Sequence, residues 1–336
     1  MQVLVTGGLG YIGSHTTVEL LQKGFDVVIV DDLSNSKLNV FDKIKVITGK
    51  NPKLEIIDLK DKIEVEKLFR DFNFDGIIHF AAHKSVNESV NFPEKYYKNN
   101  IGALENLLEN IDEEMYFIFS SSCTVYGQAD IMPITETLPI KKSESPYGET
   151  KQICEGILKN FCDTNPLFNN ITLRYFNPIG AHKSGMIGEL PLGKPENLVP
   201  FLTQTAIGKR EQLVVFGDDY NTSDGTCIRD YIHIEDLANV HVSCLEYLIQ
   251  KKNKANYEFY NVGTGKGLSV LELINLFEKV NNVKINYRIG ERRKGDVVIA
   301  FADVSKILKN VGWECEFSVE DALKSSWIWE KNLKNE

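Results

Sequence analysis

The chain has 336 residues, of which 43% are hydrophobic and 25% charged, and its formal net charge is −9. This composition is ordinary for a soluble globular protein, and the length predicts two lobes rather than one core. The negative charge argues against a general nucleic-acid binder, which needs a basic face. The sequence has no run of about 18 apolar residues, so we expect no membrane span.

Strands and helices are expected to alternate in the first half of the chain. We expect strands at 1–6, 26–30, 54–57, 76–80, 116–120 and 171–175, and helices at about 12–24, 61–71, 93–110 and 147–163. Such alternation forms parallel βαβ units and a doubly wound α/β sheet covered on both faces. The second half, from about 177, is expected to form a smaller α+β lobe with helices near 198–208, 235–250, 269–281 and 318–331. A cofactor and a substrate would meet in a cleft between the two lobes.

Three glycines indicate a dinucleotide site. Gly7, Gly10 and Gly13 follow the first predicted strand and open the first helix, which is the context of a Rossmann-like phosphate loop. Glycines there permit a tight turn and a close backbone approach, and the helix N-terminus offers free N–H groups to phosphate. Asp31 ends the second strand, where a carboxylate accepts hydrogen bonds from ribose hydroxyls. Because this carboxylate would repel a 2′-phosphate, NAD is favoured over NADP.

Tyr147 and Lys151 are four residues apart and face the same way on a predicted helix, with Ser145 and Pro146 as its cap and first residue. A free tyrosine has a pKa of about 10 and is a poor base at neutral pH. A nearby cation favours the phenolate, so we expect Lys151 to lower the pKa of Tyr147 and make it a usable acid or base. Taken alone, such a pair is more often a solvated surface feature.

The cysteines and the first residues bear on the compartment. The six cysteines show neither C-x-x-C spacing nor a His/Cys metal pattern, so we expect reduced thiols and no metal site. Residues 1–6 read as a strand and not as a signal peptide. We therefore expect a cytoplasmic protein.

Seven blocks of sequence, in order, resemble the extended short-chain dehydrogenase/reductase family, and within it the UDP-galactose (UDP-glucose) 4-epimerases. The blocks begin at Val5, His79, Phe119, Ser145, Arg174, Asp224 and Arg292, and the match runs essentially end to end. The resemblance implies an NAD-binding Rossmann domain at 1–176 and a nucleotide-sugar-binding lobe at 177–336, with an approximate boundary that the chain can cross. It also implies a homodimer formed by the helices at about 93–110 and 147–163.

The resemblance assigns roles to individual residues. Tyr147 would be the catalytic acid/base, Lys151 would lower its pKa and bind the nicotinamide ribose, and Ser122 would hydrogen-bond the sugar C4 oxygen. These three and the following residues match NAD-contacting positions: Gly7, Gly10, Tyr11, Ile12, Gly13, Asp31, Asp32, Leu33, Ser34, Asn35, Ser36, Asp58, Leu59, Phe80, Ala81, Ala82, His83, Lys84, Asn99 and Phe176. With Ser122 and Tyr147, the following match positions that hold the UDP-sugar: Asn177, Asn197, Leu198, Val214, Val215, Phe216, Arg229, Tyr231, the run from Arg293 to Asp296, and Ala300.

Some of these assignments have simpler alternatives. Leu59, Phe80 and Ala81 could be core residues, and Asp58 could be a cap rather than a ligand. Arg292 and Arg293 could be a solvated pair; we expect Arg293 to be the one that faces the site. The arginines would supply charge-assisted contacts to a diphosphate that the net charge otherwise repels.

The implied reaction is a transient oxidation at C4 of the hexose, rotation of the 4-keto sugar, and return of the hydride to its other face. Two alternatives are a 4,6-dehydratase or another nucleotide-sugar enzyme of the family, and a non-catalytic NAD sensor. Cys123 and Thr124 stand where dehydratases carry an acidic pair, which disfavours the first, and the retained Tyr147–Lys151 pair disfavours the second.

Two positions depart from the family pattern. Ala82 and His83 replace a common Gly-Leu beside the cofactor. Ala300 matches a position beside the sugar 2-substituent, where a tyrosine restricts the site to plain hexoses. Its small side chain predicts that UDP-GlcNAc and UDP-GalNAc are accepted as well as UDP-glucose and UDP-galactose.

Overall fold

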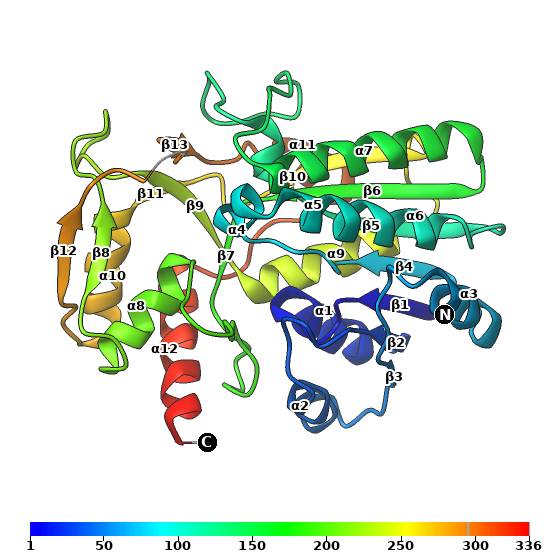
Figure 1. Cartoon of the computed structure of the whole chain (residues 1–336), viewed down its shortest axis with the longest axis horizontal. Coiled ribbons are helices and arrows are strands. Elements are labelled where there is room, and N and C mark those ends of the chain that lie inside the picture. The colour runs from blue at the N-terminus through cyan, green and yellow to red at the C-terminus, as the bar shows by residue number, and fades with distance from the viewer. Residues whose placement is uncertain (294–295, 336) are drawn as a thin grey trace.

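The computed structural model describes residues 1–293 and 296–335, which form a larger and a smaller lobe (Figure 1). The larger lobe is built on a seven-stranded sheet of order β10-β6-β5-β4-β1-β2-β3, with every neighbouring pair parallel. Its strands are β1 (Gln2–Thr6), β2 (Asp26–Val30), β3 (Lys53–Glu55), β4 (Gly76–His79), β5 (Met115–Ser122), β6 (Phe168–Tyr175) and β10 (Tyr257–Val262). The doubly wound fold class expected from the sequence is confirmed.

Helices cover both faces of this sheet (Figure 1). One layer contains α1 (Tyr11–Gln22), α2 (Asn39–Thr48) and α9 (Ile234–Ile249). The other contains α3 (Lys62–Asp71), α6 (Gly102–Leu108) and α7 (Pro146–Thr164). Successive strand residues divide between two cores: Val3 and Val5 pack with the first layer, whereas Leu4 packs with the second. The period of two along each strand therefore explains why the strands are apolar throughout.

Short helices connect β4 to α6. They are α4 (Val86–Asn91), α5 (Pro93–Tyr96) and the π-helix η1 (Tyr97–Ile101), and a 3-10 turn, η2 (Cys123–Tyr126), follows β5. The helix expected at 93–110 is thus divided into α5, η1 and α6. Wide turns of this type occur frequently at functional sites, and η1 carries Asn99.

The smaller lobe lies beyond the carboxyl ends of the parallel strands (Figure 1). Its elements are β7 (Asn177–Ile179), α8 (Leu198–Ala206), β8 (Leu213–Phe216), β9 (Ile228–His233), β11 (Gly267–Ser269), α10 (Val270–Asn281), β12 (Tyr287–Gly290), β13 (Ile299–Ala300) and α12 (Val319–Asn335). The lobe contains two small sheets. One has the order β11-β9-β13, with β7 also paired to β9, and the other is the β12-β8 pair. Residues from α8, α10 and α12 close the core of this lobe.

Two segments of the second half return to the larger lobe. The strand β10 pairs with β6, and α9 packs against α1 and β5. Four elements were not expected from the sequence: α2, α4, β10 and α11 (Ser305–Val311). In β10, Glu258 and Asn261 interrupt the apolar pattern. Among the described residues, no helix has the length and apolar character needed to cross a membrane.

Candidate active site

The glycine loop between β1 and α1 requires its glycines for steric reasons. Gly7 has a φ of +65°, and a Cβ there would lie 2.9 Å from the Ala81 nitrogen. At Gly13 a Cβ would lie 2.2 Å from the Gly7 oxygen. Gly10 is the N-cap of α1 and provides no side-chain cap, so no side chain occupies the position above the first helical N–H groups. The loop therefore presents a bare helix N-terminus that fits a phosphate group.

Asp31 holds the loop from the neighbouring strand. Its buried carboxylate accepts hydrogen bonds from the Leu9 nitrogen at 2.9 Å, the Leu33 nitrogen at 3.0 Å and the Ser36 hydroxyl at 2.6 Å. Leu33 adopts a left-handed φ of +60°, an unusual conformation that this turn stabilises. A carboxylate has about four acceptor positions, so Asp31 retains capacity for a ribose hydroxyl. Asp32, Ser34 and Asn35 are exposed beside it.

Loops after β3 and β4 complete the cofactor side. The His83 nitrogen donates to the Asn100 side chain at 2.8 Å, and Asn100 donates to the His83 oxygen at 3.1 Å. The Lys60 ammonium joins Asp58 and Asn99, at 3.0 Å from each. Leu59 is a core residue, which was the simpler of the two alternatives for it. Phe80 and Ala81 are partly buried, each against one of the two cores of the larger lobe.

Ser122, Tyr147 and Lys151 come from adjacent elements. Ser122 is the last residue of β5, and α7 begins beside it with Ser145 as its N-cap and Pro146 as its first residue. Lys151 is only 3% exposed. Its ammonium donates to the Ser120 oxygen at 2.6 Å and lies 5.9 Å from the centre of the Tyr147 ring. The pair predicted from the helical spacing therefore faces the carboxyl end of β5.

The pKa values of the pair differ from the sequence-based expectation. Burial raises the pKa of Tyr147 to about 12, and the hydrogen bond from Ser122 offsets only part of this rise. Burial lowers the pKa of Lys151 to about 8, against the opposing effects of Cys154 and Glu155. The pKa of Lys151 lies below that of Tyr147, so the lysine has already lost its positive charge at the pH where the phenol ionises. At neutral pH the phenol is therefore protonated in this state.

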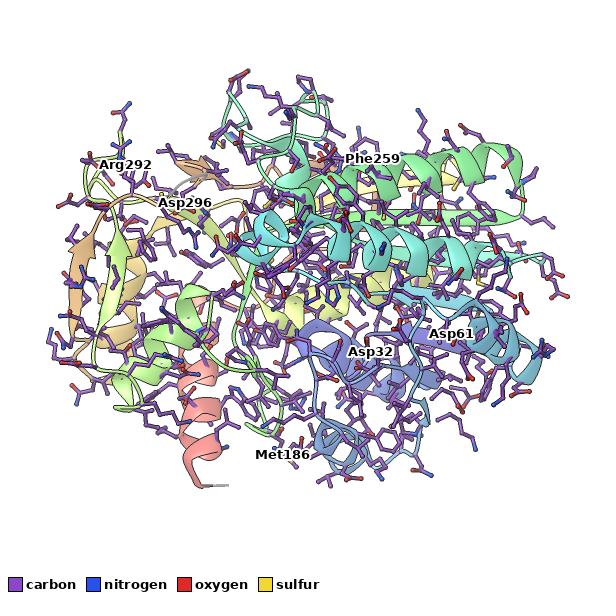
Figure 2. All side chains as sticks on the ribbon, viewed as in Figure 1. Asp32, Asp61, Met186, Phe259, Arg292 and Asp296 are labelled. Carbon is purple, nitrogen blue, oxygen red and sulfur yellow. The ribbon has the colours of Figure 1, made fainter. Side chains whose placement is uncertain are left out.

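A compact charge cluster lies on the substrate side. The Asp296 carboxylate is 2.5 Å from the Arg293 guanidinium and 3.7 Å from that of Arg229 on β9. Arg292 is separate, with Asp219 at 2.7 Å and the Tyr220 ring centre at 4.2 Å. Figure 2 shows Asp296 in the smaller lobe and Asp32 in the larger one. That Arg293 and not Arg292 faces the site stays a prediction. Lys294 and Gly295, also expected here, lie outside the described residues.

The remaining substrate positions lie on β7, β8 and β9 and at the start of α8 in the smaller lobe. Asn177 on β7 lies opposite Tyr231 on β9, and Asn197 is the N-cap residue before Leu198. Phe216 is 46% exposed at the end of β8, with the Arg293 guanidinium 5.7 Å from its ring centre. Val214 precedes it and is partly buried. The side chains of Val215 and Tyr231 instead belong to the core of the smaller lobe.

Ala300 connects the two sides of the site. It lies on β13 opposite Arg229 and is 7% exposed. It belongs to a cluster that contains Phe176, and Cys123 packs against that cluster. A residue 178 positions from Ser122 in sequence is therefore packed close to the end of β5.

Three residues that hydrogen-bond to predicted site residues were not expected from the sequence. Ser120 receives Lys151 through its backbone oxygen, which no side-chain pattern can signal. Asn100 secures His83, and the Asn-Asn pair before Ile101 could have indicated it. Glu189 accepts hydrogen bonds from Lys84 and Asn197. A hollow of about 230 Å³ between α1 and α9 lies elsewhere and is lined by none of the predicted site residues.

No metal cluster of three or more His, Cys, Asp or Glu side chains occurs among residues 1–293 and 296–335. All six cysteines are free thiols. The fold, the glycine loop with Asp31, and the Ser122–Tyr147–Lys151 group together define an NAD-dependent extended short-chain dehydrogenase/reductase.

Comparisons with known proteins identify the branch. The family model described as GDP-mannose 4,6 dehydratase matches residues 4–326. UDP-glucose 4-epimerase of Dictyostelium discoideum is 47% identical over 331 residues, covering 98% of this chain and 95% of the relative. The Haemophilus influenzae enzyme of the same name is 46% identical, covering 99% and 98%.

Solved structures give the same result. The Stenotrophomonas maltophila UDP-glucose-4-epimerase with bound NAD and formylated UDP-arabinopyranose superposes with a TM-score of 0.95 at 43% identity, covering 100% of this chain and 99% of that one. The Bifidobacterium longum enzyme in complex with NAD+ and UDP has a TM-score of 0.94 at 43% identity, with the same coverage. The chain belongs to the family of NAD-dependent UDP-glucose 4-epimerases, which confirms the sequence-based prediction.

Proposed function

We propose that this enzyme interconverts UDP-glucose and UDP-galactose with Tyr147 as acid/base, Ser122 as its partner at the C4 oxygen, and Lys151 as the cation behind them. Bound NAD supplies the hydride chemistry at C4. The observation that carries the proposal is the Ser122–Tyr147–Lys151 group, with Ser122 and Lys151 buried and Tyr147 partly buried, at the carboxyl edge of the sheet that also carries the glycine loop. Parallel α/β sheets bind ligands at this edge.

Tyr147 and Ser122 handle the proton. With its pKa near 12, the free phenol is a poor base. Positive charge brought beside it would favour the phenolate. Ser122 stabilises that phenolate by donating a hydrogen bond, because it is already the group that lowers the pKa of Tyr147. The same hydroxyl then connects the phenol to the sugar oxygen at C4.

Arg229 and Arg293 would hold the diphosphate while the hexose turns. Both guanidiniums share Asp296 in this structure, so a diphosphate would compete with one carboxylate for two cations. Guanidinium binds phosphate with charge-assisted, often bidentate hydrogen bonds. With the nucleotide anchored, the 4-keto hexose is free to turn its other face to the cofactor. The residues expected to contact NAD would hold the cofactor in the larger lobe.

Tyr147→Phe tests the assignment. It removes the hydroxyl and keeps the ring, so epimerisation should fall by at least about a thousandfold, within the range typical of acid–base catalysis. NAD should remain bound, as measured by its release on denaturation. Unchanged turnover of UDP-galactose would refute the role of Tyr147, and loss of NAD would show that the variant perturbs binding instead.

A dehydratase or a non-catalytic NAD sensor is less well supported. Burial raises the pKa of Cys123 to about 11, so its thiol stays protonated and cannot replace a carboxylate next to Ser122. Thr124 is no acid at neutral pH. A sensor has no need of a buried ammonium behind a tyrosine. Turnover of UDP-galactose without loss of water separates the three.

The site also supports UDP-N-acetylhexosamines as substrates. Ala300 pairs opposite Arg229 and belongs to the Phe176 cluster, and its small side chain takes up less space there than a tyrosine would. The acetamido group on C2 would lie against this small side chain.

We further propose a cytoplasmic homodimer. Six free thiols suit a reducing compartment. Ile153 on α7 is 37% exposed, and Val90 and Phe92, just before α5, are each 61% exposed, which supports the helices at about 93–110 and 147–163 as the interface. Light scattering on the purified protein tests the dimer. Residues 1–176 and 177–336 remain the proposed NAD and nucleotide-sugar domains, with α9 and β10 crossing back to the first.

A further inference from the structure

The loop after β7 is folded back on itself and fixed to α12. Ala181 and Gly188 form an antiparallel bridge, and the His182 nitrogen donates to the Ile187 oxygen at 3.0 Å. Met186, labelled in Figure 2, belongs to the turn of this loop. A Cβ at Gly188 would lie 2.6 Å from the Trp329 ring, so the loop packs directly on that ring. The backbone of the next residue, Glu189, is therefore held in place.

Three hydrogen bonds connect Glu189 to α12 and to both lobes. Its backbone oxygen accepts the Trp329 indole N–H at 3.0 Å. Its carboxylate Oε1 accepts Asn197 Nδ2 at 2.6 Å and Lys84 Nζ at 3.3 Å. Asn197 belongs to the smaller lobe and Lys84 to the loop after β4 in the larger one. The Glu189 side chain is only 11% exposed. It therefore links the two lobes through a carboxylate that is largely shielded from solvent.

The carboxylate determines how both donors are presented. A carboxylate only accepts hydrogen bonds, so the amide nitrogen of Asn197, and not its oxygen, must face Glu189. One of its two N–H groups then remains for a ligand. The Lys84 ammonium likewise keeps N–H groups beyond the one given to Glu189. Because the Asn197 contact is shorter and Lys84 is 52% exposed, orientation of Asn197 is the larger effect.

We propose that Glu189 is a positioning residue that aligns Asn197 for the nucleotide sugar and Lys84 for the dinucleotide, and so couples the two halves of the site through one carboxylate. The inference rests on the proposed function, which assigns Lys84 to NAD and Asn197 to the UDP group. The hydrogen bonds of Glu189 go to Trp329, Asn197 and Lys84, and none joins it to Ser122, Tyr147 or Lys151. Its removal should therefore weaken binding and leave the chemical step largely intact.

The test uses the NAD-loaded enzyme with Glu189→Ala, Glu189→Gln, Asn197→Ala and the double variant Glu189→Ala/Asn197→Ala. Glu189→Ala should raise the Kd for UDP, measured by calorimetry, and the KM for UDP-galactose about tenfold, as expected for loss of a charge-assisted hydrogen bond, with kcat within about twofold. Glu189→Gln keeps an acceptor for Asn197, so it should restore UDP affinity while NAD retention still falls. The double variant should bind UDP no more weakly than Asn197→Ala.

Separate results would overturn the inference and the proposed function. Wild-type UDP affinity and NAD retention in Glu189→Ala, or a double variant whose loss is the product of the two single losses, would overturn the role of Glu189. If Asn197→Ala itself binds UDP normally, the assignment of Asn197 to the nucleotide is wrong. Glu113→Ala, at an exposed loop carboxylate, controls for the lost charge. Should Glu189→Ala fail to fold by thermal melting, Glu189→Gln and its separate effects on UDP and NAD decide the question.

Discussion

Substitution of Ala300 by tyrosine gives the sharpest prediction of substrate range. Ala300 is 7% exposed, lies opposite Arg229 on β9 and belongs to the Phe176 cluster. A tyrosine cannot fit into that cluster without displacing its neighbours, and the displaced atoms would enter the space beside the sugar C2. We expect them to occupy the space that an acetamido group on C2 needs.

The magnitude follows from the size of the groups. One methylene in an apolar pocket changes specificity by about 10- to 200-fold, and an acetamido group adds more than one such unit. Ala300→Tyr should therefore lower kcat/KM for UDP-GalNAc at least about a hundredfold and alter that for UDP-galactose only a few-fold. Overpacking should cost about 1–3 kcal/mol of stability. Ala300→Cys, which adds one heavy atom, is the matched control and should retain both activities.

The assay is parallel turnover of UDP-galactose and UDP-GalNAc, without added NAD, followed by chromatography of the nucleotide sugars. Wild-type protein that fails to convert UDP-GalNAc would refute the reasoning at once. Equal loss of both activities in Ala300→Tyr, with a folded protein by thermal melting, would show that Ala300 supports the fold and does not select the sugar.

Three further predictions concern charge and cofactor. Burial lowers the pKa of Lys151 from 10.5 to about 8, so between these pH values the unfolded chain binds more protons than the folded one. The free energy of unfolding should therefore rise with pH across that window. In denaturant titrations, Lys151→Met should show a weaker dependence of stability on pH. Glu155→Gln leaves the buried Arg174 guanidinium, now bonded to both Glu155 oxygens, without its counter-charge and should cost about 3–5 kcal/mol in urea unfolding. Asp31→Ala should lower NAD retention in the purified enzyme, and retention at the wild-type level would contradict its role.

Local patterns in the sequence determined the elements and the cofactor loop. The apolar runs of the β-strands, the glycine spacing after β1 and the four-residue spacing of Tyr147 and Lys151 are each features of a short segment of the chain. All three occur in the structure as the sequence predicted. Such features depend on backbone geometry and burial of one face, which a short segment encodes by itself.

Tertiary structure alone decided how these elements are used. The strand β10, with Glu258 and Asn261 in its run, joins the larger sheet only because β6 offers it an unpaired edge. Burial of the phenol, which depends on the packing around it, dominates the pKa of Tyr147 even though Lys151 lies on the same side of α7. Glu189 meets donors 105 and 8 residues away. Burial and long-range hydrogen bonds arise from which segments pack together, and no local pattern in the chain carries that information.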